Sequence, residues 1–173
     1  IEKKKTNFLK IRKIYLDIKI PKNILILATF FFTTLAIAML MLFVFSTKYA
    51  SRHMKNGGVI INIGSFAGKI PIKNSSIYSA LKSAVPNFTM SAAYELANKS
   101  IRVNCIMPGV IRTPLSSDYI DGKGTQLTNY IALNRVGTVE DISDTIGFLA
   151  SDNSSYINGA TLEVTGGKLV VQP

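Results

Sequence analysis

Glycine is confined to one part of this chain. All twelve glycines lie at or after Gly57, and residues 1–56 contain none. Charge divides at the same place: residues 1–56 hold eleven Lys or Arg against two acidic residues, and residues 57–173 hold nine against eight. Tight turns and close backbone approaches depend on glycine. We therefore expect one compact domain over residues 57–173, and the basic character confined to the first third gives no reason to expect nucleic-acid binding.

The glycine-free part divides again by hydropathy. Residues 1–23 are predicted to be a basic tail, although Phe8, Ile11, Ile14 and Ile18 also have the spacing of a short amphipathic helix. Residues 24–56 are predicted to form a long apolar helix. Its segment Ile24–Phe45 has 22 residues and no charge, enough at about 1.5 Å per residue to cross a bilayer. A helix buried against the domain that follows is the alternative.

Short apolar runs alternate with longer helical patterns after residue 57. Strands are predicted at Val59–Ile63, Ile101–Ile106 and Ala160–Val164, and helices over 75–98 and 139–150. Ser75 or Ser76 is a candidate N-cap of the first helix, and Glu140 and Asp141 suit the start of the second. Strands alternating with helices predict an α/β fold, with a parallel sheet covered on both faces.

One set of side chains in this region suits proton transfer. Tyr78 and Lys82 are four residues apart and share one face of the predicted helix, and Ser65 lies thirteen residues before Tyr78, after the first strand. A phenol with a pKa of about 10 serves at neutral pH only if its anion is stabilised, as a nearby ammonium can do. The same spacing also occurs on ordinary helix surfaces. His53 and Cys105 are single residues of their kind, so no metal site is predicted.

Longer segments around these residues resemble the short-chain dehydrogenase/reductase family. IINIGSFAG resembles the family's strand and serine loop, and IYSALKSAV its catalytic helix. IRVNCIMPGVIRTP resembles the next strand and the Pro-Gly loop beside the nicotinamide, and LNRVGTVEDISDTIGFLASDNSSYINGATLEVTGG the last helix, last strand and closing Gly-Gly. The resemblance covers residues of about 46–167. It implies a Rossmann-like, three-layer αβα fold with a parallel sheet.

The resemblance also implies roles for individual residues. Tyr78 would be the general acid-base, Ser65 would orient the substrate carbonyl, and Lys82 would stabilise the Tyr78 anion and hold the nicotinamide ribose. The remaining cofactor contacts would come from Pro108, Gly109, Val110 and Thr113. Residues 114–126 would form a mobile lid. On the residues alone, Thr113 can equally be a helix cap, and Pro108-Gly109 a simple turn.

What the resemblance implies for the whole protein is an NAD(P)-dependent carbonyl reductase or alcohol dehydrogenase, with 3-oxoacyl reductases among the members sharing its closing motifs. NAD and NADP both stay open as cofactor. The substrate would be a small carbonyl compound or alcohol, and family members usually form homo-oligomers.

The pattern departs from the family before residue 46. The family's cofactor-binding βαβ units start at a glycine-rich turn that brings the backbone close to the pyrophosphate, and residues 1–56 contain no glycine. Met39 falls where the family usually has an asparagine that completes a proton relay. We therefore expect a truncated fold that lacks these units.

Three interpretations of the whole chain follow. The first is part of a cytoplasmic reductase in which residues 1–38 are foreign to the enzyme. The second is a membrane-anchored relative in which Ile24–Phe45 spans the bilayer. The third is a catalytically inactive remnant that binds another protein.

Overall fold

The computed structural model describes residues 22–55, 57–70 and 72–168. Residues 1–21 of the predicted basic tail lie outside the described residues. The chain divides into two units, with the boundary between Ile37 and Ala38 inside the first helix. The fold described below is that of the unit from Ala38 onward. The boundaries predicted at residues 23 and 56 stay predictions.

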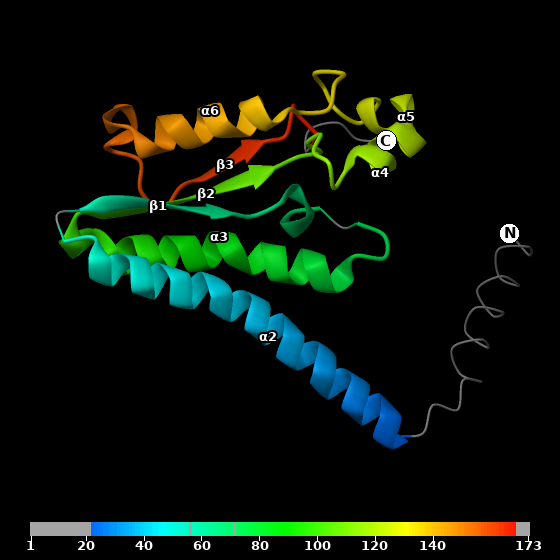
Figure 1. Cartoon of the computed structure of the whole chain (residues 1–173), viewed down its shortest axis with the longest axis horizontal. Helices are drawn as coiled ribbons and strands as arrows, with labels where there is room; N and C mark the ends of the chain where they lie inside the picture. The colour runs from blue at the N-terminus through cyan, green and yellow to red at the C-terminus, as the bar shows by residue number, and fades with distance from the viewer. Residues whose placement is uncertain (1–21, 56, 71, 169–173) are drawn as a thin grey trace, which may run out of the picture. The chain divides into compact units, whose positions relative to one another are not determined.

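Helices and strands alternate along the described chain (Figure 1). The helices are α2 (Lys22–His53), α3 (Ser76–Leu96), α4 (Ser117–Lys123), α5 (Thr125–Thr128) and α6 (Val139–Ala150). The strands are β1 (Gly58–Ile63), β2 (Ile101–Pro108) and β3 (Thr161–Val164), and three single-turn helices lie at η1 (Phe66–Gly68), η2 (Ala97–Lys99) and η3 (Asp152–Ser154). These bounds confirm the predicted order of elements.

The three strands form one parallel sheet in the order β1-β2-β3. Ile63 of β1 pairs with Ile106 of β2, which in turn pairs with Leu162 of β3. Helix α3 lies on one face of the sheet and α6 on the other (Figure 1). This arrangement confirms the predicted αβα fold with its Rossmann-like parallel sheet.

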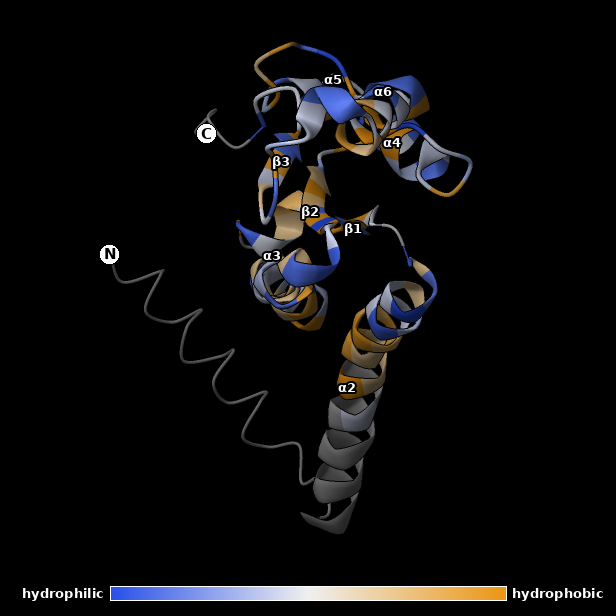
Figure 2. Cartoon of the chain, turned by 90° about the vertical axis from the view of Figure 1, so that its left-hand side faces the viewer, coloured by the Kyte–Doolittle hydropathy of each residue, from blue (hydrophilic) through white to orange (hydrophobic). Residues whose placement is uncertain are grey.

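Strand β2 is the centre of the core because it has a strand on each side and a helix on each face. Its odd-numbered residues face α3: Ile101 and Val103 pack with Ala92 and Ala93. Further along the same face, Cys105 and Met107 pack with Val85 of α3. β1 and β2 consist mainly of hydrophobic residues (Figure 2); β2 is largely buried, whereas β1, at the edge of the described sheet, is mostly half-buried.

On the other face of β2, two polar side chains are tied to the α6 side by hydrogen bonds. Arg102 donates to the carbonyl oxygens of Leu149, Ser151 and Ile157. Asn104, which is fully buried, donates to the Ile157 carbonyl and accepts from the Ala160 amide at 2.9 Å. These contacts satisfy backbone groups of the connection into β3 that would otherwise be buried without partners.

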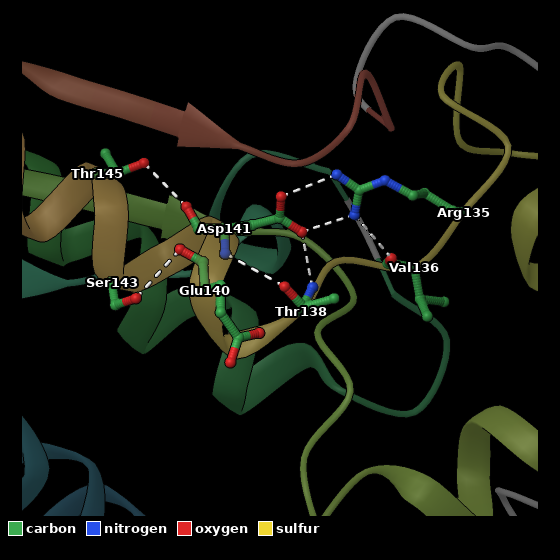
Figure 3. A network of polar contacts seen from close by, with 7 residues as sticks. All are labelled: Arg135, Val136, Thr138, Glu140, Asp141, Ser143 and Thr145. Carbon is green, nitrogen blue, oxygen red and sulfur yellow. Dashed lines mark hydrogen bonds and ion pairs between the residues drawn. The ribbon is translucent and has the colours of Figure 1, made fainter.

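Helix α6 begins with a reciprocal cap. Thr138 Oγ1 accepts from the Asp141 amide, and Asp141 Oδ2 accepts from the Thr138 amide at 2.7 Å (Figure 3). The Asp141 carboxylate also accepts two hydrogen bonds from the Arg135 guanidinium. This confirms the predicted acidic start of α6. The predicted cap of α3 is only partly right: Ser75 is the N-cap residue, but its side chain makes no capping hydrogen bond.

Two further predictions differ from the structure. β2 extends through Pro108, which pairs with Val164; a proline fits here because it is the last residue of the strand, where the next amide, that of Gly109, donates to the Val164 carbonyl. The segment after Thr113, for which no helix was predicted, contains α4 and α5. Their buried Ile120 and Leu127 anchor both short helices to the domain.

Helix α2 occupies the region of the predicted long apolar helix. Among the residues that the structure describes, no helix combines enough length with enough apolar character to cross a membrane. The transmembrane interpretation of Ile24–Phe45 is therefore not supported. In the unit from Ala38 onward, Phe43 of α2 packs against the core cluster of Val85, Cys105 and Met107, so this part of the apolar surface is used within the domain.

Candidate functional site

The serine predicted to orient a substrate lies in the loop directly after β1. Ser65 is the N-cap of η1, and its Oγ accepts a hydrogen bond from the Ala67 amide at 3.2 Å. The side chain is largely enclosed, because Ser65 is only 7% exposed. Since the hydroxyl accepts from Ala67, its own proton is free to be donated to another group.

Gly68 fixes this loop against α3. A Cβ atom at residue 68 would lie 2.6 Å from the carbonyl carbon of Lys82, a distance that no side chain tolerates. Only glycine therefore lets η1 pack directly on the helix backbone at this point. The serine loop and the Lys82 turn of α3 are held together by this contact.

The helix residues Tyr78 and Lys82 lie beside the same strand end. Lys82 Nζ donates to the carbonyl oxygen of Ile63, the last residue of β1, at 2.9 Å, and lies 5.9 Å from the centroid of the Tyr78 ring. Tyr78 is 44% exposed. The structure thus brings the three predicted residues to the carboxyl end of β1, although no hydrogen bond among the described contacts joins Ser65 to Tyr78.

Helix α2 adds two residues to this neighbourhood. Met39 and Phe43 line a small cavity of about 30 Å³ together with Tyr78 and Lys82, and Lys82 Nζ lies 5.7 Å from the centroid of the Phe43 ring. The resemblance to the family had already placed Met39 near the site, at the position where the family usually has an asparagine. It missed Phe43, although the spacing of four residues puts both side chains on one helix face.

The four residues of the predicted cofactor loop do not share one cavity. Pro108 and Thr113 line an apolar groove against α6, whereas Val110 lines a cavity on the side of α4 and α5. A Cβ at Gly109 would lie 2.8 Å from the Cα of Thr165, so glycine is required there by the chain that follows β3. The hydroxyl of Thr113 lies 3.0 Å from that of Ser116, and the Thr113 amide donates to the same Ser116 oxygen.

The only cysteine of the chain lies under this site. Cys105 is fully buried in β2, and burial raises the pKa of its thiol above the ordinary value. The reactive form of cysteine is the thiolate, which this environment disfavours. Cys105 is therefore a residue of the core.

Comparison with known proteins agrees with this geometry. A family model described as Enoyl-(Acyl carrier protein) reductase matches residues 31–168. The human protein named (3R)-3-hydroxyacyl-CoA dehydrogenase is 38% identical over 127 residues, which is 72% of this chain and 49% of that protein. The 3-oxoacyl-[acyl-carrier-protein] reductase FabG of Pseudomonas aeruginosa is 38% identical over 110 residues, which is 64% of this chain and 44% of that protein.

Solved structures are similar over the same region. ElxO with NADP bound superimposes with a TM-score of 0.65 and 34% identity, covering 71% of this chain and 52% of that one. A short-chain type dehydrogenase/reductase from Mycobacterium ulcerans gives a TM-score of 0.67 and 34% identity, covering 72% and 47%. The chain thus spans about half the length of these relatives, and it is a member of the short-chain dehydrogenase/reductase family.

Proposed function

We propose that this chain carries the proton-transfer half of the active site of an NAD(P)-dependent oxidoreductase that interconverts a carbonyl compound and an alcohol. The observation that carries the proposal is the attachment of the Tyr78–Lys82 turn of α3 to the end of β1, through the Lys82–Ile63 hydrogen bond and the close approach at Gly68. The relatives, which are named dehydrogenases and reductases, support the same reaction class.

In this proposal each residue acts at the substrate oxygen. Tyr78 passes a proton to that oxygen during reduction and removes it during oxidation. The free proton of Ser65 is donated to the same oxygen, where negative charge develops. Lys82 is kept beside Tyr78 by its bond to the Ile63 carbonyl, so its positive charge stabilises the phenolate. A nicotinamide, when bound, supplies or accepts the hydride.

The residues present fit the nicotinamide end of such a cofactor. Lys82 has two ammonium protons left after its bond to Ile63, and these suit ribose hydroxyl groups. The groove beside Pro108 and Thr113 has an almost wholly apolar wall, which suits one face of a planar ring. The pyrophosphate end has no such fit here, because residues 1–56 hold no glycine. Whether NAD or NADP is used stays open.

Substitution of Tyr78 tests the proposal. In a complex of this chain with a polypeptide that supplies the cofactor-binding half, Tyr78→Phe removes only the hydroxyl and is expected to abolish nicotinamide-dependent turnover of a carbonyl substrate, followed by NADPH absorbance. Tyr94→Phe is the matched control, because Tyr94 lies on the same helix and is 88% exposed. Turnover that survives Tyr78→Phe would refute the assigned role.

The open edge of β1 favours a second candidate, a catalytically inactive protein that binds a partner. Within the described sheet, β1 pairs only with β2, so the other edge of this largely apolar strand offers free backbone groups to another chain. This candidate predicts a stoichiometric complex without turnover. The homo-oligomer expected from the family stays a prediction under either candidate, and size measurement by light scattering tests it.

A further inference from the structure

The basic side chains of the catalytic domain divide into two groups by their partners. Among the nine Lys and Arg residues of 57–173, three form ion pairs, namely Lys69 with Glu163, Arg112 with Asp121 and Arg135 with Asp141. Arg102 and Lys82 donate to backbone carbonyls. Four lysines remain that have no ion pair among the described residues: Lys73, Lys99, Lys123 and Lys168.

Three of these four lysines line a single cavity. Lys73 comes from the loop before α3, Lys123 from the last turn of α4, and Lys168 from the segment after β3. The cavity has a volume of about 360 Å³, within the range of small-molecule sites. Its described wall contains no Asp or Glu. Three cations from distant parts of the chain thus meet around one space without a carboxylate to balance them.

Aromatic rings hold one of these ammonium groups in place. Lys168 Nζ lies 5.8 Å from the centroid of the Phe66 ring and 5.5 Å from that of Tyr130. Both distances fall within cation–π range. Partial burial lowers the pKa of Lys168, because removing water from around the ammonium disfavours its charged form. An anion in the cavity would replace the missing water with a counter-charge.

The cavity adjoins the proposed reaction site. Its wall includes Phe66, which follows Ser65, and Val110, which follows the Pro108-Gly109 turn. A substrate whose carbonyl lies at Ser65 would therefore extend its other end past Phe66 toward the lysines. The ring of Tyr119 and the amide of Gln126 add polar groups from α4 and α5.

We propose that this cavity binds the anionic end of the substrate, so that the enzyme acts on carbonyl compounds or alcohols that bear a carboxylate or phosphate group. Lys123 and Lys168 are the specificity-determining residues, with Lys73 adding charge at the rim. The inference rests on the proposed function for the position of the carbonyl, but the binding of the anion is measurable without turnover.

Binding of matched probes to the 173-residue chain tests this inference. Cyclohexanecarboxylate and its neutral amide, cyclohexanecarboxamide, have nearly the same shape, and each is titrated while amide chemical shifts are followed by NMR. We expect the carboxylate to bind about tenfold more tightly than the amide, as one charge-assisted contact predicts. Lys123→Gln and Lys168→Gln should each remove most of this difference. Lys99→Gln, at a lysine outside the cavity, should leave it unchanged.

Inorganic phosphate distinguishes the two anion chemistries. If phosphate displaces cyclohexanecarboxylate, the inference is supported and the anionic group of the substrate is assigned as a phosphate. If phosphate does not displace it, the inference is supported and that group is assigned as a carboxylate. Equal binding of acid and amide, or no effect of either lysine substitution, would overturn it. The Tyr78→Phe measurement separates this failure from failure of the proposed function, because the anion probes do not depend on proton transfer.

Discussion

Asp141 binds Arg135 and the first turn of α6 at the same time. Both contacts need the ionised carboxylate, and the Arg135 guanidinium holds the pKa of Asp141 well below its usual range. A pKa lowered by folding stabilises the protein at every pH above the unfolded value of about 3.9, and that stabilisation is lost as the pH falls toward the folded value. The acid limb of the stability curve should therefore depend on this residue.

Replacing Asp141 tests that dependence. Asp141→Asn is expected to lower the free energy of unfolding at pH 7, and its deficit should shrink progressively below about pH 4, where the parent also loses the advantage. Urea unfolding at a series of pH values measures both. Asp144→Asn, an exposed carboxylate on the same helix, serves as the control. A deficit that stays constant from pH 7 to pH 2.5 would contradict the assignment.

Asn104 supports the sheet through contacts that sequence reasoning did not anticipate. Its amide group bonds the Ile157 carbonyl and the Ala160 amide, and both partners lie more than fifty positions away along the chain. Asn104→Ala would leave these backbone groups unpaired in a buried site. We expect a loss of about 2–4 kcal/mol in the free energy of unfolding, measured in urea, whereas Asn87→Ala at an exposed position of α3 should change it by less than about 0.5 kcal/mol. Equal effects would refute this role.

At the scale of elements, α3 contains a proline near its middle. Pro86 has no amide proton, so the carbonyl of Lys82, four residues earlier, lacks its helical donor. Pro86→Ala restores that donor and is expected to raise the free energy of unfolding by about 1–3 kcal/mol. Thermal unfolding followed by circular dichroism checks this, with Ser91→Ala on the same helix as control. A destabilised Pro86→Ala protein would show that the ring fills space that alanine leaves empty.

The sequence predicted the elements whose signal is local and continuous. The apolar strands and the helices α3 and α6 were found because their periodicity and flanking turns lie within single segments. α4 and α5 were missed because short polar helices depend on distant packing partners for their stability. The spacing of Tyr78 and Lys82 predicted that they share one helix face. The Lys82–Ile63 hydrogen bond and the contact of Gly68 with Lys82 could not be predicted in this way, because they join residues that are far apart in the sequence.

At the scale of the whole molecule, the proposed proton-transfer residues lie on a domain whose described sheet resembles only part of the relatives' fold. The described sheet has three strands with β1 at one edge, and the chain spans about half the length of its relatives. The proposed site residues lie in the loop after β1, on α3, and at the end of β2 and in the loop after it, all within the matched region. In the family, the backbone approaches the pyrophosphate at a glycine-rich turn that follows a strand of the same sheet. Such a strand would pair with the open edge of β1.

This arrangement predicts how the 173-residue chain responds to NADPH. Alone, it should cause no saturable change in NADPH fluorescence, because residues 1–56 contain no glycine from which the family's pyrophosphate-binding turn could be built. Addition of a polypeptide carrying the amino-terminal half of the Pseudomonas aeruginosa relative should produce saturable binding. The same polypeptide with alanines in its glycine-rich turn should pair with β1 without restoring that binding. Tight NADPH binding by the chain alone would contradict the prediction, and it would show that residues outside the family pattern hold the phosphates.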